Sequence, residues 1–290
     1  MMKSIIRKDI LTAILLVIAL VLVGCSNSET NKTDEIKENI VLNATFEITV
    51  LNTGSSDCTI IQIEDKVLMI DTGLKSNGDY IIKTLKEKGI TNIDYLILTH
   101  MDKDHIGGAP KILDNVTVNN VIAADYTKDS KQYESYISAL NSHGITAQLP
   151  HENIYLDINN AKIEIFPAEK NSYEESNDYS IIVGITYGDY SYLFAGDAEE
   201  ERLAEFINSN DRQYNFVKIP HHGRYNLLSE TFIDDIDPNY AFITCSEEEP
   251  ADSEELEMLK SKGINTYLSL NGDIIIKSDG KIISLEQKAK

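Results

Sequence analysis

The sequence predicts an α/β fold in which two mixed β-sheets pack face to face and helices cover the outside, an αββα sandwich. Three observations predict it. Short alternating or β-branched runs recur along the chain, and amphipathic helical patterns fall between the later runs. No Pro/Gly/Ser-rich stretch and no fixed-period repeat interrupts the chain after about residue 46. Strands followed by alternating strands and helices fit two sheet layers between helices.

Residues 1–24 have the composition of an export signal. Three basic residues precede an apolar run from Ile10 to Val23, which is shorter than the ~18 to 20 residues that span a hydrocarbon core. The run ends in LVGC, which resembles the lipobox of bacterial lipoproteins. This resemblance implies that residues 1–24 are removed and that Cys25 is lipidated. An uncleaved anchor helix is the alternative, and either would hold an extracytoplasmic protein at the cell membrane.

The segment 25–45 is polar and charged, with almost no apolar periodicity, and it predicts a flexible tether behind the lipidated cysteine. The folded part is then expected to cover 46–290. That length suits one two-sheet α/β domain, so we predict a single domain.

The composition limits the partners that the protein can attract. A formal net charge of −21 repels polyanions at long range, so a nucleic-acid substrate would need a local metal site to hold it. Apart from Cys25 the chain has only Cys58 and Cys245. We interpret both as small core residues at strand ends, without a disulfide between them.

The periodicity places the individual elements in chain order. Strands are predicted at 46–51, 58–64, 66–71, 93–99, 119–124, 162–166, 179–187, 190–196, 215–220, 240–245, 264–270 and 273–278. Helices are predicted at 79–89, 130–144, 199–209, 227–236 and 253–263. Three of these helices end at a glycine, which suits a helix C-cap.

Polar side chains follow several of the predicted strands directly. The residues in these positions are Asp71, His100, Asp197, His221 and His222. Strand ends at one edge of a sheet can converge even when they are far apart in sequence. We therefore expect these side chains to line one cleft, with a rigid floor and variable loops.

The segment HMDKDH places two imidazoles and two carboxylates within six residues, from His100 to His105. On a turn, the side chains at 100, 102 and 104 can point to one side, and His105 can close on the same cavity. Carboxylates a few ångströms apart repel each other unless a cation lies between them. The segment therefore predicts a divalent metal site, and the two glycines that follow allow a tight turn into a helix.

HMDKDHIGG resembles the HxHxDH signature of the metallo-β-lactamase superfamily. It is more similar to the HxDxDH variant found in the hydrolase domain of ComEC-type competence proteins. VLMIDTG, the NDYSIIVGITYGDYSYLFAGDAE stretch and VKIPHHG resemble further family elements in the same order. The resemblance covers most of the chain from about Phe46, and it implies a metallo-β-lactamase-like hydrolase domain.

The resemblance also implies a centre of two divalent metal ions. The six implied ligands are His100, Asp102, Asp104, His105, Asp197 and His222. The first two would serve one ion and the next two the second, with Asp197 bridging the ions and His222 completing the second site. Nitrogen and oxygen ligands without cysteine suit Zn²⁺ or Mn²⁺.

Further roles follow from the same resemblance. The implied catalytic residues are Asp104, Asp71 and His221. Asp71 would orient the ligands from behind, and His221 would contact substrate or protonate a leaving group. The candidates for substrate contact are Asn177 or Ser180, and Arg224, which stands where these relatives usually have Ser.

The chain departs from the family pattern at several positions. It has no ligand His between the first signature and Asp197, because we interpret His143 and His151 as surface residues. A TGSSD turn, ending at Asp57, replaces the glycine-rich GQGD turn, and a His-Pro pair is absent near Glu249. These differences motivate the alternative of a catalytically degenerate binding or scaffold lipoprotein.

The leading hypothesis from sequence is an exported, lipid-anchored, metal-dependent hydrolase. Its Asp-rich signature favours phosphodiester or related ester substrates, with nucleic acid among them, attacked by a water activated by two metal ions. Amide or lactam hydrolysis is a further alternative.

Overall fold

The computed structural model describes residues 44–288. The predicted signal peptide, Cys25 and nearly all of the predicted tether lie outside the described residues, as do 289 and 290. Within 44–288, no helix combines the length and the apolar character that a bilayer crossing requires.

The first sheet has seven strands in the order β14-β13-β1-β2-β3-β4-β5. Its strands are β1 (Phe46–Val50), β2 (Thr59–Ile63), β3 (Lys66–Ile70), β4 (Asn92–Leu98), β5 (Thr117–Ala123), β13 (Asp273–Ser278) and β14 (Ile283–Lys288). β3, β4 and β5 run parallel, whereas the other neighbours pair antiparallel. The sheet is therefore mixed, as predicted.

The second sheet also has seven strands, in the order β12-β11-β10-β9-β8-β7-β6. Its strands are β6 (Ile154–Ile158), β7 (Ala161–Phe166), β8 (Ile182–Tyr187), β9 (Tyr190–Phe194), β10 (Phe216–Lys218), β11 (Tyr240–Ile243) and β12 (Asn265–Leu268). β9 to β12 run parallel and β6 to β9 antiparallel. Each sheet thus contains one parallel region whose strands end at a common edge.

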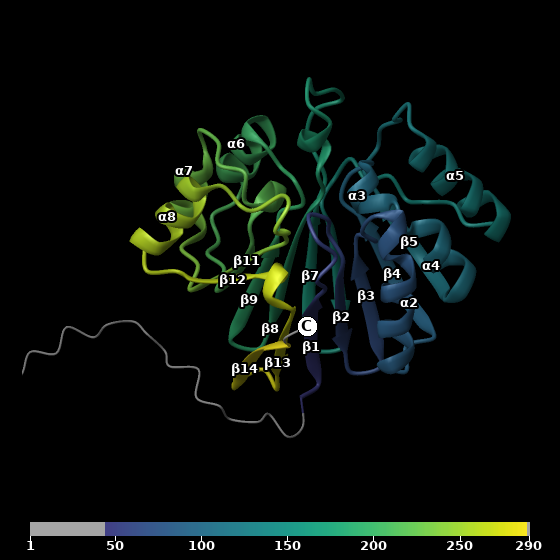
Figure 1. The fold of residues 1–290 in the computed structure, drawn as a ribbon, viewed down its shortest axis with the longest axis horizontal. Helices are drawn as coiled ribbons and strands as arrows, with labels where there is room; N and C mark the ends of the chain where they lie inside the picture. The colour runs from purple at the N-terminus through teal and green to yellow at the C-terminus, as the bar shows by residue number, and fades with distance from the viewer. Residues whose placement is uncertain (1–43, 289–290) are drawn as a thin grey trace, which may run out of the picture. The chain divides into compact units, whose positions relative to one another are not determined.

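Helices cover the two outer faces, and Figure 1 shows them to the left and right of the paired sheets. One set is α2 (Gly78–Glu87), α3 (Lys103–Ile106), α4 (Ala109–Asn115) and α5 (Lys131–His143), and the other is α6 (Glu200–Ser209), α7 (Ser229–Ile236) and α8 (Ser253–Ser261). Short 3₁₀ turns complete the chain at η1 (Lys75–Asn77), η2 (Ser176–Tyr179), η3 (Pro220–Gly223) and η4 (Ser269–Asn271). The predicted αββα arrangement is confirmed.

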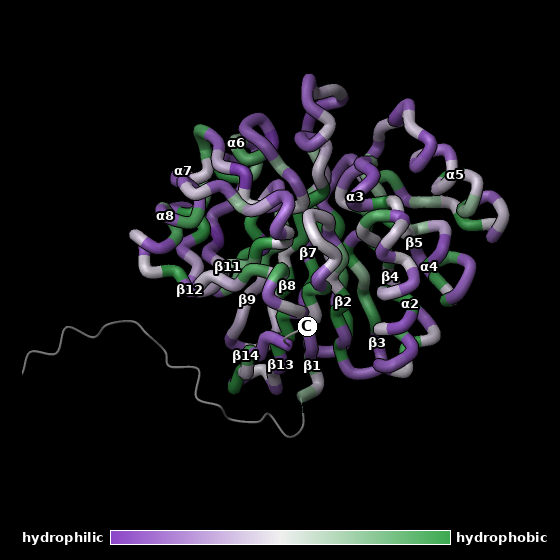
Figure 2. The backbone as a smooth tube through the Cα atoms, in the orientation of Figure 1, coloured by the Kyte–Doolittle hydropathy of each residue, from purple (hydrophilic) through white to green (hydrophobic). Residues whose placement is uncertain are grey.

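An aromatic stack joins the two sheets in the core. The ring of Phe46 from β1 lies 4.6 Å from Tyr187 and 5.2 Å from Tyr192 of the second sheet, centroid to centroid, and Tyr192 stacks on Phe216 at 4.9 Å. Full burial of one such apolar side chain contributes about 1.5 to 3 kcal/mol. Figure 2 shows hydrophobic strand segments in the middle of the domain and polar segments on the outside. This rigid core holds the strand ends in place.

Cys58 and Cys245 are both buried and free, as the sequence predicted.

Candidate metal centre

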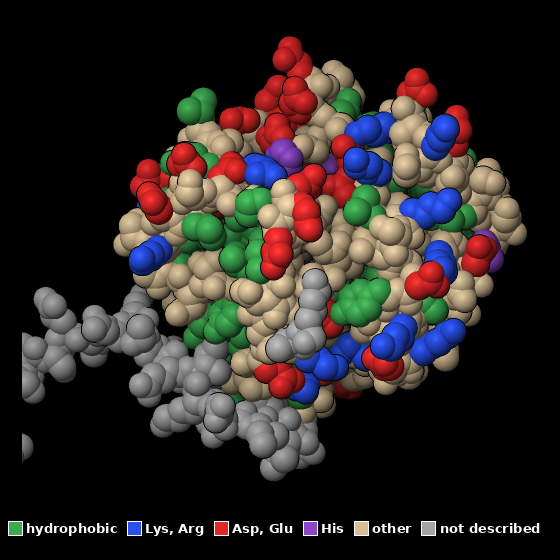
Figure 3. Space-filling view, in the orientation of Figure 1, with side chains coloured by type: hydrophobic (Ala, Val, Ile, Leu, Met, Phe, Trp, Pro, Cys, Tyr) green, Lys and Arg blue, Asp and Glu red, His purple; other side chains and the backbone are tan. Residues whose placement is uncertain are grey.

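The predicted site residues lie where parallel strands of both sheets end. β3 and β4 lead directly to Asp71 and His100, while β9 and β10 lead to Asp197 and His222. Loops after the carboxyl ends of parallel strands are the usual place for ligands in α/β proteins. Figure 3 shows histidine side chains near the top of the view, surrounded by acidic ones.

Four side chains converge in what we call the four-ligand cluster: Asp104, His105, Asp197 and His222. Each offers one ligand atom, and these atoms all lie within 4.8 Å of one another. His105 Nε2 is 3.1 Å from Asp197 Oδ2, and His222 Nε2 is 3.3 Å from both Asp197 Oδ2 and Asp104 Oδ2. The Asp104 side chain is 23% exposed, so the cluster reaches solvent there. Two carboxylates and two imidazoles at this spacing fit a divalent cation.

Hydrogen bonds from behind orient both imidazoles of the cluster. His105 Nδ1 donates to Asp71 Oδ2 at 2.8 Å, and His222 Nδ1 donates to the Thr244 carbonyl at 2.9 Å. Because each Nδ1 carries the donated proton, each Nε2 faces the cluster and is the nitrogen that a metal ion would bind. Asp71, predicted to orient the ligands, lies in the expected position.

His100 lies beside the cluster with its ring centroid 4.0 Å from that of His105. The Thr99 hydroxyl donates to Asp71 Oδ2 at 2.8 Å, so its oxygen accepts from His100 Nδ1 at 3.3 Å. His100 Nε2 is buried and has no hydrogen-bond partner within residues 44–288. A buried nitrogen lone pair without a partner is costly, and a metal ion would satisfy it.

The carboxylates of the four-ligand cluster favour the protonated form of its two imidazoles, at the positions where metal ions would bind. Burial disfavours the charged form of His222, but the Asp197 carboxylate and the hydrogen bond with Asp104 raise its pKa to about 9. Burial likewise opposes the charged form of His105, and the Asp197 and Asp71 carboxylates raise its pKa well above the ordinary value. In contrast, burial and the neighbouring His105 lower the pKa of His100 to about 3.

A buried lysine underlies the cluster, and the sequence analysis missed it. Lys218, the last residue of β10, forms an ion pair with Asp57, lies 3.4 Å from Asp197 Oδ1 and donates to the Gly196 carbonyl at 2.9 Å. Burial opposes the charge of Lys218, but the Asp57 and Asp197 carboxylates raise its pKa. A lysine inside the apolar strand FVKIP was the available signal, because a buried ammonium needs a carboxylate partner.

Asp57 comes from the TGSSD turn, which looked like a departure from the family. Its carboxylate lies with Asp71 and His105 in a second group of potential ligand atoms, and its backbone N–H donates to the Asp104 carbonyl at 3.1 Å. Burial raises the pKa of Asp57, but Lys218 and the nearby imidazoles lower it by more, so the pKa lies below its ordinary value. The altered turn therefore keeps a carboxylate inside the centre.

Asp102 is separated from the four-ligand cluster by its own partners. It precedes α3, and its Oδ1 forms an ion pair with Lys128 and accepts a hydrogen bond from Ser176 at 3.0 Å. His100 Nε2 lies 3.9 Å from the same oxygen. The two residues predicted to share one ion, His100 and Asp102, therefore lie next to each other, and Lys128 is paired with the Asp102 carboxylate.

The turn η3 sends its two histidines in different directions. His221, His222 and Gly223 all have left-handed backbone angles, with φ of 47°, 54° and 79°. A Cβ atom at Gly223 would lie 2.8 Å from the Ala251 side chain, so only glycine fits there. Non-glycine residues in this region cost of order 1 to 3 kcal/mol each, and such strain is typical of functional turns.

His221 points away from the cluster toward α6. Its Nδ1 lies 2.9 Å from Glu199 Oε1, and Asn177 Nδ2 lies 2.8 Å from that oxygen and 3.4 Å from His221 Nε2. The His221 side chain is 31% exposed and therefore accessible to a substrate. Its hydrogen bond lowers the pKa of Glu199.

Two of the residues predicted for substrate contact are held by partners within the protein. Ser180 is fully buried and its hydroxyl accepts the Asp197 N–H at 3.1 Å, so it supports the loop that carries Asp197. Arg224 Nη1 binds Asp252 at 2.9 Å and the Pro250 carbonyl at 3.1 Å.

The two remaining histidines lie on the surface, as predicted. His143 and His151 pair with Asp114 and Asp125 at 2.9 and 3.1 Å, and their side chains are 35% and 70% exposed. Neither histidine contributes to the four-ligand cluster.

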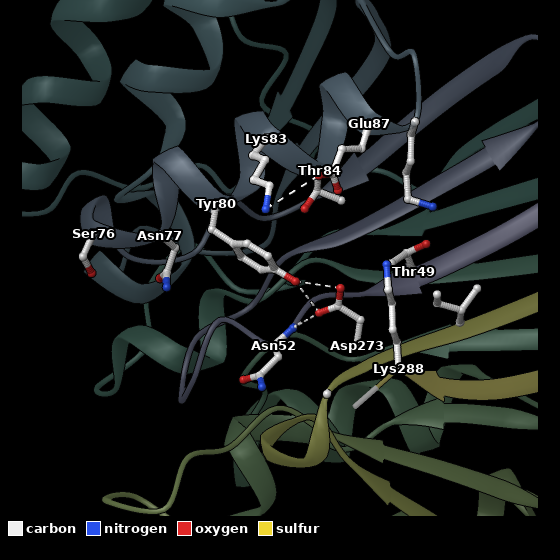
Figure 4. A pocket seen from close by; sticks show the side chains of 13 residues that line it. Thr49, Asn52, Ser76, Asn77, Tyr80, Lys83, Thr84, Glu87, Asp273 and Lys288 are labelled. Atoms are coloured by element: carbon white, nitrogen blue, oxygen red, sulfur yellow. Dashed lines mark hydrogen bonds and ion pairs between the residues drawn. The ribbon is translucent and has the colours of Figure 1, made fainter. Parts of the chain in front are cut away.

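A separate pocket of 690 Å³ lies between α2 and β13. Figure 4 shows Tyr80 reaching across it to Asp273, which it meets at 2.6 Å, with lysines at the rim. Among the described residues, no histidine or cysteine lines this pocket, so it lacks the ligand set of the metal centre.

Comparisons with known proteins agree with this geometry. The sequence model of the metallo-beta-lactamase superfamily matches residues 51–246. The chain is 27% identical over 165 residues to ComE operon protein 3 of Bacillus subtilis and 24% identical over 241 residues to Recombination protein 2 of Haemophilus influenzae. These alignments cover 57% and 78% of this chain, but only 21% and 28% of those longer proteins.

Solved structures share the fold. The metallo-beta-lactamase fold protein YhfI of Bacillus subtilis superposes with a TM-score of 0.53 and 12% identity, covering 80% of this chain and all of YhfI.

Proposed function

The chain belongs to the metallo-beta-lactamase superfamily, whose members are generally metal-dependent hydrolases, and we propose that it cleaves phosphodiester or related ester bonds. The observation that carries the proposal is the four-ligand cluster, in which two carboxylates and two oriented imidazoles from both sheets meet within 4.8 Å. Two divalent ions, zinc or manganese, would complete the centre together with His100 and Asp102.

Bound divalent ions would supply Lewis acidity and a water molecule with a lowered pKa. The chain's own residues provide the positioning. Asp71 and Thr244 hold the imidazoles of His105 and His222 with Nε2 facing inward, so no rotation is needed when a cation arrives. Asp104 is the most exposed member of the cluster and would face the substrate.

His221 is placed to serve the leaving group. Glu199 accepts from its Nδ1, and its Nε2, which lies 3.4 Å from Asn177 Nδ2, would exchange a proton with a group that approaches from solvent and replaces that contact. A protonated His221 would then deliver its proton to the departing alkoxide. Asn177, bonded to Glu199, keeps this pair in position.

Two observations support an ester of phosphate over a lactam. The HMDKDH segment has Asp102 in place of the middle histidine, as in the competence-type signature that it resembles. Two of the similar proteins are named as a ComE operon protein and a competence protein. The acidic surface does not favour long polyanions, so a nucleic-acid substrate would depend on the centre itself.

The test is hydrolysis of bis-p-nitrophenyl phosphate with added Mn²⁺ or Zn²⁺. We expect metal-dependent turnover that Asp104→Ala abolishes. The matched control is Asp114→Ala, which removes an exposed carboxylate, 66% accessible, whose partner is His143 and not a member of the cluster. Absence of metal-dependent turnover on this ester and on single-stranded DNA would sink the proposal.

The same preparations separate the alternatives. Turnover of nitrocefin without turnover of phosphodiesters would identify a lactam hydrolase. Elemental analysis that finds less than one metal ion per chain, after purification with added metal, would identify a degenerate binding protein.

We also propose that the protein is exported and anchored through a lipid on Cys25. Its support is the LVGC segment after a basic and apolar leader. Cys25→Ala is expected to move the protein from the membrane fraction to the soluble extracytoplasmic fraction, while Cys58→Ala leaves its distribution unchanged. An unchanged membrane association of Cys25→Ala would contradict the lipid anchor.

A further inference from the structure

One oxygen atom, Asp102 Oδ1, has two competing roles. It forms an ion pair with Lys128, from the loop between β5 and α5, and it accepts from Ser176 in η2. Lys128 Nζ also donates to Ser176 Oγ at 3.1 Å, so lysine, serine and aspartate form a closed group. This group links three segments that are distant in sequence.

The same oxygen faces Nε2 of His100, a buried nitrogen with no hydrogen-bond partner among the described residues. His100 Nε2 is buried without a hydrogen bond, and Asp102 Oδ1 is the carboxylate oxygen 3.9 Å from it. An ion placed between His100 Nε2 and the nearest oxygen of Asp102 would therefore meet the oxygen that Lys128 holds. An ammonium and a divalent cation on one carboxylate oxygen repel each other strongly at such short range.

The other lysine of the centre has the opposite arrangement. Lys218 contacts Asp197 through Oδ1, while Oδ2 faces His105 and His222. It therefore neutralises the carboxylate from behind and leaves the ligand oxygen available. Lys128 and Lys218 thus differ in which oxygen of the ligand they occupy.

Lys128 can leave its position, whereas Lys218 cannot. The Lys128 side chain is 29% exposed and the Lys218 side chain 3%. Among residues 44–288, Asp102 is the one carboxylate that pairs with Lys128. A long flexible side chain at the surface moves into water at little cost.

We propose that Lys128 competes with a divalent ion for Asp102, so that the centre fills in two unequal steps. The first ion binds the four-ligand cluster, and the second binds His100 and Asp102 only when the Lys128 ammonium moves away. This inference rests on the proposed metal-dependent function. It makes Lys128 a residue that sets how many ions the protein carries at a given metal concentration.

The experiment is calorimetric titration of metal-stripped protein with Mn²⁺, without substrate. Wild type is expected to bind one ion tightly and a second weakly. Lys128→Met keeps the apolar stem and removes the charge, and it should tighten the second step by at least about tenfold, the lower end for a change in the surroundings of a ligand. The first step should change little, because Lys128 does not contact the four-ligand cluster.

Two further variants make the result specific. Lys128→Arg keeps the charge and can bind the carboxylate with two N–H groups, so it should weaken the second step further. Lys131→Met, at an exposed position three residues later, changes the net charge equally and should leave both steps unchanged. Opposite shifts for Met and Arg cannot arise from a general loss of folding.

The outcomes distinguish this inference from the proposed function. Two equal steps in wild type, or an unchanged second step in Lys128→Met, would overturn the competition while the hydrolase proposal stands. A single ion in both proteins would also overturn it, since the second site would then be absent and not blocked. Failure of every variant to bind Mn²⁺ or Zn²⁺ would instead refute the metal-dependent function.

Discussion

The two halves of the metal centre are built from neighbouring residues but differ in charge. In the four-ligand cluster, the carboxylates outweigh burial, and the pKa of His222 rises to about 9. At His100, burial and the adjacent His105 prevail, and its pKa falls to about 3. One half therefore attracts cations before any metal arrives, whereas the other offers a neutral nitrogen and a carboxylate already paired with Lys128.

The difference follows from what the second sheet contributes. β9 and β10 deliver Asp197 and His222 to Asp104 and His105. No histidine from the second sheet reaches His100 among the described residues, because the chain's other mid-sequence histidines are on the surface. The number of ligands in a centre assembled from strand ends is therefore set by how many strand ends carry a ligand residue.

The largest expected effect comes from deleting one histidine in each half. His222→Ala should lower the affinity for the first ion by more than about 100-fold, the upper end for loss of a residue that only supports a ligand. It should also abolish turnover. His100→Ala should remove the second, weaker binding step and leave the first. Calorimetric titration distinguishes the two, with exposed His143→Ala as the control. Loss of both steps in His100→Ala would show that the halves are one site.

Replacing Lys218 should destabilise the protein more than replacing Lys128. Lys218→Met leaves Asp57 and Asp197 buried without their cation, and breaking a buried ion pair costs about 3 to 5 kcal/mol. Lys128→Met breaks a partly exposed pair, for which about 0 to 1 kcal/mol is expected. Urea unfolding of metal-stripped protein measures both free energies.

A double variant provides the check on this difference. Lys218→Met with Asp57→Asn should recover part of the lost stability, because one uncompensated charge is removed with the other. Equal losses for Lys218→Met and Lys128→Met would contradict the distinction between an internal and a displaceable lysine.

Asp71→Asn should weaken metal binding in both halves of the centre, but to different extents. Asp71 binds His105 directly but reaches His100 only through the Thr99 hydroxyl. The affinity for the first ion should fall about 10- to 100-fold, the usual effect of a supporting carboxylate, and the second step should weaken less. Asp94→Asn is the control, since Asp94 also supports a strand, through the Val67 N–H at 3.0 Å, away from the centre. A larger loss at the second step would refute this route of support.

Much of the fold could be predicted from local periodicity. The helix predicted at 130–144 is α5, and its terminal Gly144 has a left-handed φ of 64°. The edge strands β6 and β14 were not predicted, because each has one buried residue only, and pairing with β7 or β13 defines them. The likeness to the metallo-beta-lactamase superfamily and to competence proteins is confirmed.

The site was predictable from the HMDKDH segment, which holds Asp104 and His105, and elsewhere where a ligand residue type coincides with a strand end. Asp197 and His222 satisfy both conditions, and they meet as expected. Lys128 and Asp57 do not directly follow a predicted strand, and their partners lie 26 and 161 positions away, at Asp102 and Lys218. Contacts of that kind depend on how loops from different strands pack, which no local pattern encodes.

The smallest effect is on the pH dependence of stability without metal, and its sign differs between the halves. The pKa of His222 is raised to about 9 from about 6.5 in the unfolded chain, so the stability it contributes is complete below pH 6.5 and is lost as the pH rises toward 9. The slope is at most about 1.4 kcal/mol per pH unit. The pKa of His100 is lowered, so its contribution instead grows between pH 3 and 6.5 and is flat above.

Urea unfolding of metal-stripped protein from pH 6.5 to 9 therefore tests the carboxylate-rich half alone. We expect stability to fall across this range in wild type and in His100→Gln, and to fall less in His222→Gln. Saturating Zn²⁺ should remove the slope, because the ion replaces the proton on the imidazole. A steeper fall in His222→Gln than in wild type would mean that the proton is held elsewhere, and the contrast between the two halves would then not rest on the carboxylates around His222.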